Sequence, residues 1–198
     1  MATAGQVLAD DPVEQLFEQE VTDGLPVVPP TRERVERMLA GAPERERDEL
    51  IGALGPCYGD ATVEKIAINA VMAGCKPEYF PVVLAGVEGL CDERFCTHGL
   101  SVTLLSGAPL AIINGPVRRQ IGLNCGHNAL GHGFRANATI GRALRLVIMN
   151  IGGARPHGIT KATMGHPGQY TFVVAEDEEA SPLEPLHVER GFQRQDSV

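Results

Sequence analysis

The clearest hydrophobic pattern in the sequence lies between residues 135 and 153. Apolar residues there recur at steps of three and four, which places them on one face of a helix with 3.6 residues per turn. These residues are Ile140, Ala143, Leu144, Val147, Ile148 and Ile151. Asn137 precedes the run as the expected N-cap, and Gly152 and Gly153 follow it as a stop signal. The pattern predicts a buried helix.

The rest of the chain alternates between helical and extended patterns. Helices are expected over 12–20, 31–40, 61–74 and 77–90, and a short one ends near Ile121. Strands are expected over 49–54, 100–105, 109–113 and 169–175. The strand at 109–113 is almost continuously apolar, which is typical of a sheet covered on both faces. These elements predict an α/β fold, a single domain with a mixed sheet flanked by helices.

The pattern also indicates how the chain is organised. We expect an N-terminal helical arm over residues 1–48, an α/β core over 49–175 and an acidic tail over 176–198. Charged residues of the arm (Arg32, Glu33, Arg34, Glu36 and Arg37) and of the tail (Glu176, Asp177, Glu178 and Glu179) are expected to face solvent. The apolar residues of the tail have no helical or strand periodicity, yet they should be buried against another surface. They are Leu183, Leu186, Val188 and Phe192.

A second chain is therefore expected to cover the tail. It would be an identical copy or a chain that supplies a missing C-terminal half, giving a homo- or hetero-oligomer. The alternative is that the tail folds back over its own sheet.

Composition narrows the class of partner. The formal net charge is -8, and no basic run exceeds two residues, which argues against nucleic acid and anionic membrane as main partners. No apolar run approaches the roughly 18–20 residues that a membrane helix needs. Five cysteines, an odd number without a signal-peptide pattern, favour reduced thiols in the cytoplasm.

The candidate chemistry lies in the loop before the helix at 135–153. Cys125, His127 and His132 lie in a glycine-rich stretch that leads into the N-terminal end of this helix. The N-terminal end of a helix favours anions. Cys125 or His127 would supply nucleophilic or acid–base chemistry, with His132 assisting. Arg135 and Asn137 would orient a carboxylate or phosphate.

Two residues outside the loop are further candidates for substrate binding. Asn114 ends an apolar strand, where ligands bind in open α/β sheets. Glu189 stands close to His187 and Glu184 in the tail, and a carboxylate beside an imidazole can form an acid–base pair.

The same loop admits a metal site. Cys125, His127 and His132 offer three ligands suited to a transition metal such as zinc or iron, with one position left open. A second set comprises Cys91, Cys96 and His98, and neither set has a standard zinc-finger spacing. The alternative is that the histidines donate to backbone carbonyls and the cysteines fill the core. Cys57 and Cys75 are expected to be packing residues.

Six stretches, spread over nearly the whole chain, carry a family resemblance. They are DGLPVVPPT (23–31), KIAINAVMAGC (65–75), NGP (114–116), RANATIGRALRL (135–146), GGARP (152–156) and EPLHVERGF (184–192). In these stretches the chain resembles bacterial proteins that contain a UGSC-like domain or are encoded beside one. The resemblance implies thiol or selenol chemistry. The relatives continue past Phe192, and their loop is poorer in cysteine and histidine.

Together these features predict an enzyme, or a subunit of one, that acts on a small carboxylate-bearing anion by lyase- or redox-type chemistry. The alternative is a non-catalytic metal- or ligand-binding subunit that completes a site on a partner chain. Metal analysis and thiol alkylation would separate the metal and thiol hypotheses.

Overall fold

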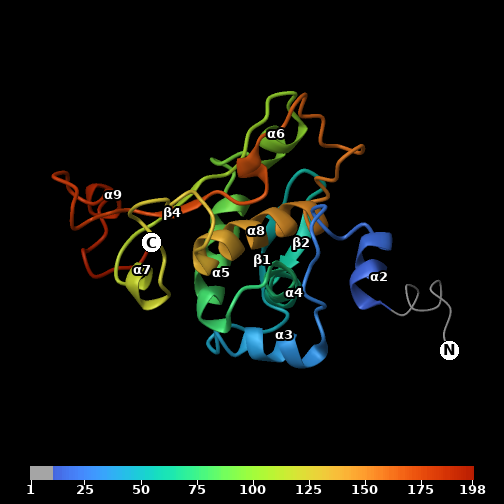
Figure 1. Ribbon diagram of the computed structural model, residues 1–198, viewed down its shortest axis with the longest axis horizontal. Helices are drawn as coiled ribbons and strands as arrows, with labels where there is room; N and C mark the ends of the chain where they lie inside the picture. Colours follow the sequence, from blue (N-terminus) through green and yellow to red (C-terminus); the bar gives the residue numbers. More distant parts are fainter. Residues whose placement is uncertain (1–10) are drawn as a thin grey trace.

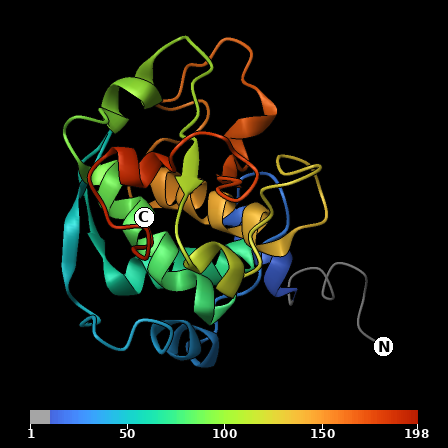
Figure 2. The ribbon, with the colours of Figure 1, turned by 90° about the vertical axis from the view of Figure 1, so that its left-hand side faces the viewer.

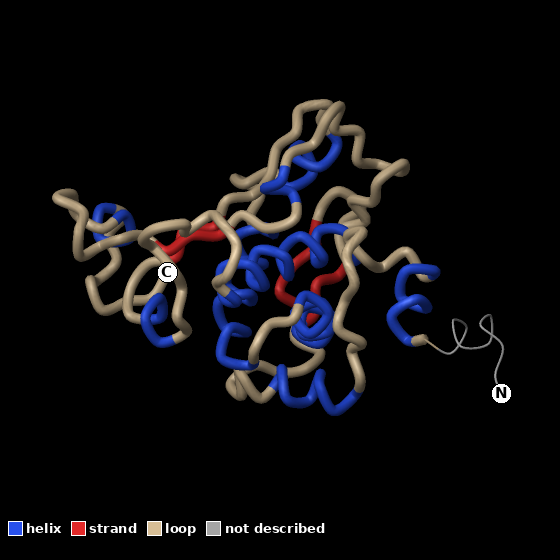
Figure 3. The backbone as a smooth tube through the Cα atoms, in the orientation of Figure 1, coloured by secondary structure: helices blue, strands red, loops and turns tan. Residues whose placement is uncertain are grey.

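The computed structural model describes residues 11–198 and combines helices with two small sheets (Figures 1 and 3). β1 (Leu50–Leu54) pairs antiparallel with β2 (Gly59–Thr62), whereas β3 (Ala111–Ile113) pairs in parallel with β4 (Val173–Ala175). The expected α/β class is confirmed. The single mixed sheet is replaced by two separate two-stranded sheets, because the elements between β2 and β3 are helical.

The expected helices all form. In chain order the helices are α2 (Pro12–Glu18), α3 (Arg32–Leu39), α4 (Val63–Ala73), η1 (Pro77–Tyr79), α5 (Phe80–Cys91), α6 (Thr97–Val102), α7 (Val117–Gln120), α8 (Arg135–Asn150), η2 (Pro167–Gln169) and α9 (Leu186–Glu189). Thr31 caps α3 by accepting a hydrogen bond from the N–H of Arg34. Gly74 ends α4 in the left-handed conformation, at φ 90°.

Helix α8 forms the centre of the core. Figures 1 and 2 show it running through the middle of the molecule with α4 and α5 against it. Its predicted apolar face is buried except for Ile151, which follows the helix and is partly buried. Leu146 and Met149, beyond that face, are buried as well. Gly86 of α5 lets the two helices approach closely, because a Cβ there would lie 2.8 Å from the side chain of Leu144. The arm contributes to the same core through Val35 and Met38 of α3.

Three strand predictions need correction. The strand expected over 169–175 is shortened to Val173–Ala175, because Pro167–Gln169 forms the 3-10 helix η2. Residues 100–105 do not form a strand, because Thr97–Val102 is helix α6 and the exposed Leu104 and Leu105 have no neighbouring strand within the described chain to pair with. The strand at 109–113 is not covered on both faces, since Ile112 is 41% exposed. Strand β2 was not predicted, because glycine and aspartate are uncommon in strands.

The last residues of the tail return to the sheet. Asn114 donates its N–H to the carbonyl of Val198 at 2.7 Å, and Figure 1 shows the C-terminus close to α7. Leu183 and Phe192 nevertheless stay 75% and 48% exposed. The start of the predicted arm, residues 1–10, lies outside the described residues. Between residues 11 and 198, no helix has the length and apolar character needed to cross a membrane.

Candidate functional site

The loop before α8 does not bring its cysteine and histidines together as metal ligands. Cys125 is partly buried against the core, whereas His127 and His132 are exposed. Among residues 11–198, no three His, Cys, Asp or Glu side chains group as they would around a metal ion. Neither predicted metal-ligand set is therefore assembled in the structure.

Asparagine side chains explain how this loop is folded. Asn124 donates its amide to the carbonyl of His127 at 2.9 Å and accepts from the N–H of Gly126 at 3.0 Å. Asn128 donates to the carbonyl of His132, also at 2.9 Å. These bonds hold the backbone of the loop in tight turns and leave both imidazoles in solvent.

The second set, Cys91, Cys96 and His98, is likewise dispersed. Cys91 lies under β1, where a Cβ on Gly52 would come within 2.8 Å of it, and Cys96 is exposed. The His98 ring stacks on Tyr58 with 5.8 Å between the centroids. All five cysteines are free thiols.

Asn137 is not the N-cap of α8. The helix begins at Arg135, with Phe134 in the cap position, so Asn137 lies inside the first turn. Its amide instead ties the loop to the helix: the oxygen accepts from the N–H of Asn124, and the nitrogen donates to the carbonyl of Asn124, both at 2.9 Å. Asn137 is only 4% exposed. It holds the loop in place and has no free donor directed at a ligand.

Asn114 lies in a buried ionic cluster beside α7. Its amide donates to the carboxylates of Glu176 and Glu178. The guanidinium of Arg118 meets the Glu178 carboxylate at 2.8 Å, with side chains 5% and 7% exposed. Glu178 is thus buried and paired rather than solvent-facing, contrary to the expectation for the tail. The cluster fastens the tail to the turn after β3.

The tail residues proposed for acid–base chemistry differ in their exposure to solvent. His187 is fully buried, 3.9 Å from the Glu178 carboxylate, and neither ring nitrogen has a hydrogen-bond partner within residues 11–198. Glu189 instead lines an open hollow of about 650 Å³ beside β3 and β4. Its apolar lining residues are Ile112, Val174, Leu183 and Leu186.

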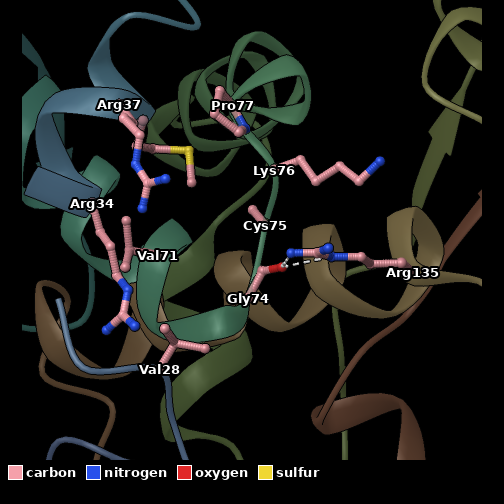
Figure 4. Close-up of a pocket in the computed structure, with 10 residues that line it drawn as sticks. Val28, Arg34, Arg37, Val71, Gly74, Cys75, Lys76, Pro77 and Arg135 are labelled. Atoms are coloured by element: carbon pink, nitrogen blue, oxygen red, sulfur yellow. Dashed lines mark hydrogen bonds between the residues drawn. The ribbon is translucent and has the colours of Figure 1, made fainter.

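Arg135, in contrast, lines a pocket of about 230 Å³ between α3, the corner at residues 74–77 and the start of α8 (Figure 4). Three more cationic side chains line this pocket. They are Arg34, Arg37 and Lys76. The apolar lining comes from Val28, Met38, Val71 and Pro77, and residues 74 and 75 form part of the wall. We call this the basic pocket.

Local sequence explains the shape of the basic pocket. Gly74 turns the chain out of α4, Lys76 is extended, and Pro77 starts the next helical turn at once. The cap at Thr31 fixes the start of α3, and Arg34 and Arg37 are three residues apart, so they are neighbours on the helix surface.

Hydrogen bonds to backbone carbonyls hold two of the guanidinium groups. Arg135 donates to the carbonyl of Gly74 through Nε at 3.1 Å and a terminal nitrogen at 2.9 Å. Arg34 donates to the carbonyl of Pro29 at 2.8 Å. Carbonyl oxygens carry no net charge, so these bonds orient the guanidinium groups without neutralising them. Each group keeps other N–H donors for a ligand.

Little negative charge balances the basic pocket. Lys76 pairs with Glu78 at 3.4 Å, with both side chains about half exposed. A backbone hydrogen bond lowers the pKa of Glu78, and Lys76 and Arg135 lower it further. Within residues 11–198, the structure gives Arg37 no ion-pair or hydrogen-bond partner. Four cations therefore face one carboxylate in the described part of the chain.

Cys75 lies against this pocket but is not an activated thiol. It is 7% exposed and donates to the carbonyl of Thr139 at 3.3 Å. Burial raises its pKa to about 12, although the hydrogen bond and Arg135 act in the opposite direction. The thiol therefore stays protonated near neutral pH and is a weak nucleophile. The chemistry that the pocket offers is recognition of an anion by charge-assisted hydrogen bonds.

Sequence reasoning found Arg135 but missed its cationic neighbours. Arg34 and Arg37 belong to a helix with charges of both signs, which is typical of a solvated face. Lys76 follows a helix stop. Only Lys76 stands where the chain changes direction, between Gly74 and Pro77, whereas Arg34 and Arg37 gave no local signal.

Comparison of the chain with protein-family models, with curated proteins and with solved structures gave no match. The interpretation of the basic pocket therefore depends on its own geometry and charge.

Proposed function

We propose that this protein binds a small carboxylate- or phosphate-bearing molecule in the basic pocket. The observation that supports the proposal is the gathering of four cationic side chains around about 230 Å³ in a chain of net charge -8. Like charges held close together repel one another, and an anion between them removes that cost. Guanidinium groups also match the planar, two-oxygen geometry of carboxylate and phosphate.

A ligand-binding subunit accounts for these features better than an enzyme that uses Cys75. The Cys75 thiol is buried and protonated, and no other cysteine or histidine of residues 11–198 lines the basic pocket. The binding role matches the alternative expected from the sequence, a subunit that completes a site on a partner chain.

Lyase- or redox-type catalysis by the loop is the second candidate. One observation favours it: Arg135 both lines the basic pocket and begins the helix that follows the loop. An anion held by Arg135 would therefore lie near the segment that carries His127 and His132. This second proposal includes three further expectations. The protein would be related to UGSC-like proteins, bind a transition metal and be located in the cytoplasm.

Isothermal titration calorimetry tests anion binding directly. Inorganic phosphate and succinate are titrated into the purified chain at fixed ionic strength. Arg37→Met should weaken binding by about tenfold, the equivalent of one lost charge-assisted contact of about 1.4 kcal/mol.

Arg32→Met is the matched control. Arg32 lies on the same helix, its side chain is 93% exposed, and it does not line the basic pocket. Both variants remove one positive charge from α3, so a general electrostatic effect would be equal in the two. Equal losses, or no saturable binding to the unmodified chain, would refute the proposal.

The partner chain is proposed to cover the hollow beside β3 and β4. Ile112 and Leu183 are 41% and 75% exposed there, although parallel sheets are ordinarily covered on both faces. Light scattering tests the contact. Leu183→Glu should dissociate an oligomer, and a chain that is monomeric before the substitution would contradict it.

A further inference from the structure

We propose that a second anion-binding site lies around Arg145 of α8, where it would hold one carboxylate or phosphate group. This site is separate from the basic pocket, because the two have no lining residue in common. Arg145 also follows Arg135 by ten residues, a distance of about 15 Å along the helix axis. The second site therefore does not depend on the function proposed for the basic pocket.

The side chain of Arg145 lines two adjacent hollows between α8 and the loop at residues 154–170. The larger hollow, of about 140 Å³, is also lined by Tyr170. The smaller hollow is also lined by Thr160. Gln169 lines both hollows, as Arg145 does. The guanidinium thus lies where a helix of the core meets a long loop.

Arg145 has no hydrogen bond or ion pair with any residue between 11 and 198. Its side chain is partly buried, and this loss of hydration is the largest influence on its pKa, which is lowered. The guanidinium is therefore partly withdrawn from water without acceptors for its five N–H donors. Such an unpaired charge is costly, and an anion beside it would offset the cost through charge-assisted hydrogen bonds.

The carboxylate of Asp23, which also lines the larger hollow, already has a partner. Its two oxygens accept from Arg142, from Nε at 2.8 Å and from a terminal nitrogen at 2.7 Å, and its side chain is only 4% exposed. Its charge raises the pKa of Arg145, but by less than the loss of hydration lowers it. Two arginines and one aspartate leave one positive charge, so the larger hollow still attracts an anion.

The hydroxyl of Thr160 is a second, independent sign of a missing ligand. It is buried and has no hydrogen-bond partner in the described part of the chain. Buried hydroxyl groups in proteins are ordinarily hydrogen-bonded. Thr160 shares the smaller hollow with Arg145, so two groups with unused donors lie in one place. An oxyanion would accept from both, directly or through one water molecule.

Hydrogen bonds outside the hollows hold their walls in place. The N–H of Gly165 donates to the hydroxyl of Ser106 at 2.8 Å, and the amide of Gln169 donates to the carbonyl of Gly107 at 3.2 Å. Figures 1 and 2 show the loop at 154–170 beside the segment that carries α6. These bonds fix the loop without using Arg145, and the amide of Gln169 keeps a second N–H for a ligand.

The available groups determine the class of ligand. A guanidinium, a hydroxyl and an amide N–H all donate hydrogen bonds, and the guanidinium adds a positive charge. A group with two or more anionic oxygens matches this set, because the planar guanidinium can bond to two oxygens at once. Cations would be repelled, and a neutral ligand would leave the charge of Arg145 without a partner.

Side-chain NMR signals report on the two anion sites separately in one titration. The Nε–H signal of Arg145 reports on the new site, and that of Arg135 on the basic pocket. Arg142 is an internal control, because its Nε–H already donates to Asp23. Inorganic phosphate and acetate are titrated separately at pH 6.5, with ionic strength held constant by sodium chloride. The signals of Arg145 and of the Gln169 amide should shift to saturation, and the tighter-binding anion identifies the preferred group.

Variants separate the new site from the basic pocket. Arg145→Met keeps an apolar stem but removes the charge, so phosphate affinity, measured from the Gln169 amide signal, should fall by at least about tenfold. Arg145→Lys keeps the charge without the planar geometry and should weaken binding less. Thr160→Val removes a hydroxyl that has no partner in the fold, so affinity should fall while stability is retained. Arg37→Met, in the basic pocket, should leave the Gln169 response unchanged.

Two results would overturn the Arg145 site, once circular dichroism shows that the variants are folded. One is an Arg145 signal that does not saturate, or that shifts equally with chloride alone. The other is a Gln169 response that is unchanged in Arg145→Met. A response at Arg145 without one at Arg135 would support this site and count against the basic pocket. A response at Arg135 alone would count against this site and leave anion binding in the basic pocket.

Discussion

Replacing Arg118 by methionine should destabilise the protein far more than removing the neighbouring charge of Arg119. The Arg118 guanidinium is nearly buried, with its side chain 5% exposed. Burial lowers its pKa, but hydrogen bonding to Glu179 and the charges of Glu178 and Glu179 raise it above its ordinary value. Arg118 is therefore a permanent buried cation whose environment depends on its charge.

The size of the effect follows from the groups left behind. Arg118 donates to the carbonyls of Gly115 at 2.9 Å and Glu176 at 2.7 Å. It also pairs with the Glu178 carboxylate, which is 7% exposed. Methionine keeps much of the volume but leaves this carboxylate without its cation. Breaking a buried ion pair from one side costs about 3–5 kcal/mol, and we expect a loss within that range.

Arg119 provides a matched control in the neighbouring position. It pairs with Glu179 at 2.7 Å, but its side chain is 71% exposed. Arg119→Met should therefore cost less than about 1 kcal/mol. A double variant, Arg118→Met with Glu178→Gln, removes both buried charges and should recover part of the loss, because the amide oxygen can still accept from the N–H of Gly115.

Urea denaturation monitored by circular dichroism measures these differences as free energies of unfolding. The slope against urea concentration must be similar in all variants for the comparison to hold. The reasoning fails if Arg118→Met and Arg119→Met lie within about 1 kcal/mol of each other. It also fails if the double variant is less stable than Arg118→Met alone, since that would place the stabilisation outside the ion pair.

Three further predictions use the same denaturation assay. Asn137→Ala should lower the free energy of unfolding by about 2–4 kcal/mol, because the N–H and the carbonyl of Asn124 lose their partner. His127→Ala should lower it by less than about 0.5 kcal/mol, because this side chain is exposed. Equal losses would contradict this. Gly141→Ala should cost about 1–3 kcal/mol of stability, since the new Cβ would lie 2.8 Å from the backbone nitrogen of Phe172. A Cβ at Gly89 would meet nothing within 4 Å, so Gly89→Ala should increase stability by about 1 kcal/mol. The opposite order of stability would refute this prediction. Burial raises the pKa of Cys75 from 9.0 to about 12, so the stability that this thiol contributes is complete below pH 9 and should fall by about 1.4 kcal/mol per pH unit as pH rises toward 12. Cys75→Ala should reduce the alkaline slope by that amount, and an unchanged slope would show another group to be responsible.

Periodic segments could be predicted from the sequence because local chemistry decides them. α8 has an apolar face repeated over four turns, and Thr31 and Gly74 mark helix ends by mechanisms that need no tertiary contact. Short apolar segments were harder. Residues 100–105 have the composition of a strand, but a strand also needs a neighbour, and only the folded chain shows that residues 11–198 provide none.

The candidate site could be predicted only in part. Arg135 follows a glycine-rich loop, which gave a local reason to select it. Arg34 and Arg37 have no such signal, because a charged helix surface looks the same in sequence whether it faces solvent or a pocket. What makes them part of a site is the corner at residues 74–77, which comes from a different part of the chain. Lys76 lies in that corner itself, and it was missed because α3, which faces it across the pocket, is distant in the sequence.

The loop at 124–133 shows why its residue types favoured a metal site. Asparagine, glycine and histidine are common in catalytic loops, and asparagine and glycine are equally common in tight turns. The sequence does not distinguish the two uses. In the structure, Asn124 and Asn128 bond to the backbone of the loop, and the carbonyls of His127 and His132, rather than their imidazoles, take part in those bonds.

Polar groups that hold the fold have their hydrogen-bond donors satisfied within the protein, whereas groups available to a ligand keep unused donors. Arg118 is the more deeply buried cation, yet its donors are used by the carbonyls of Gly115 and Glu176 and by carboxylates of the tail, so it offers nothing to a ligand. Arg37 lines a pocket and, within residues 11–198, has no partner in the structure. Burial alone would select Arg118 as the functional residue. Counting the remaining donors selects Arg37, because only unused donors can gain a charge-assisted bond when an anion arrives.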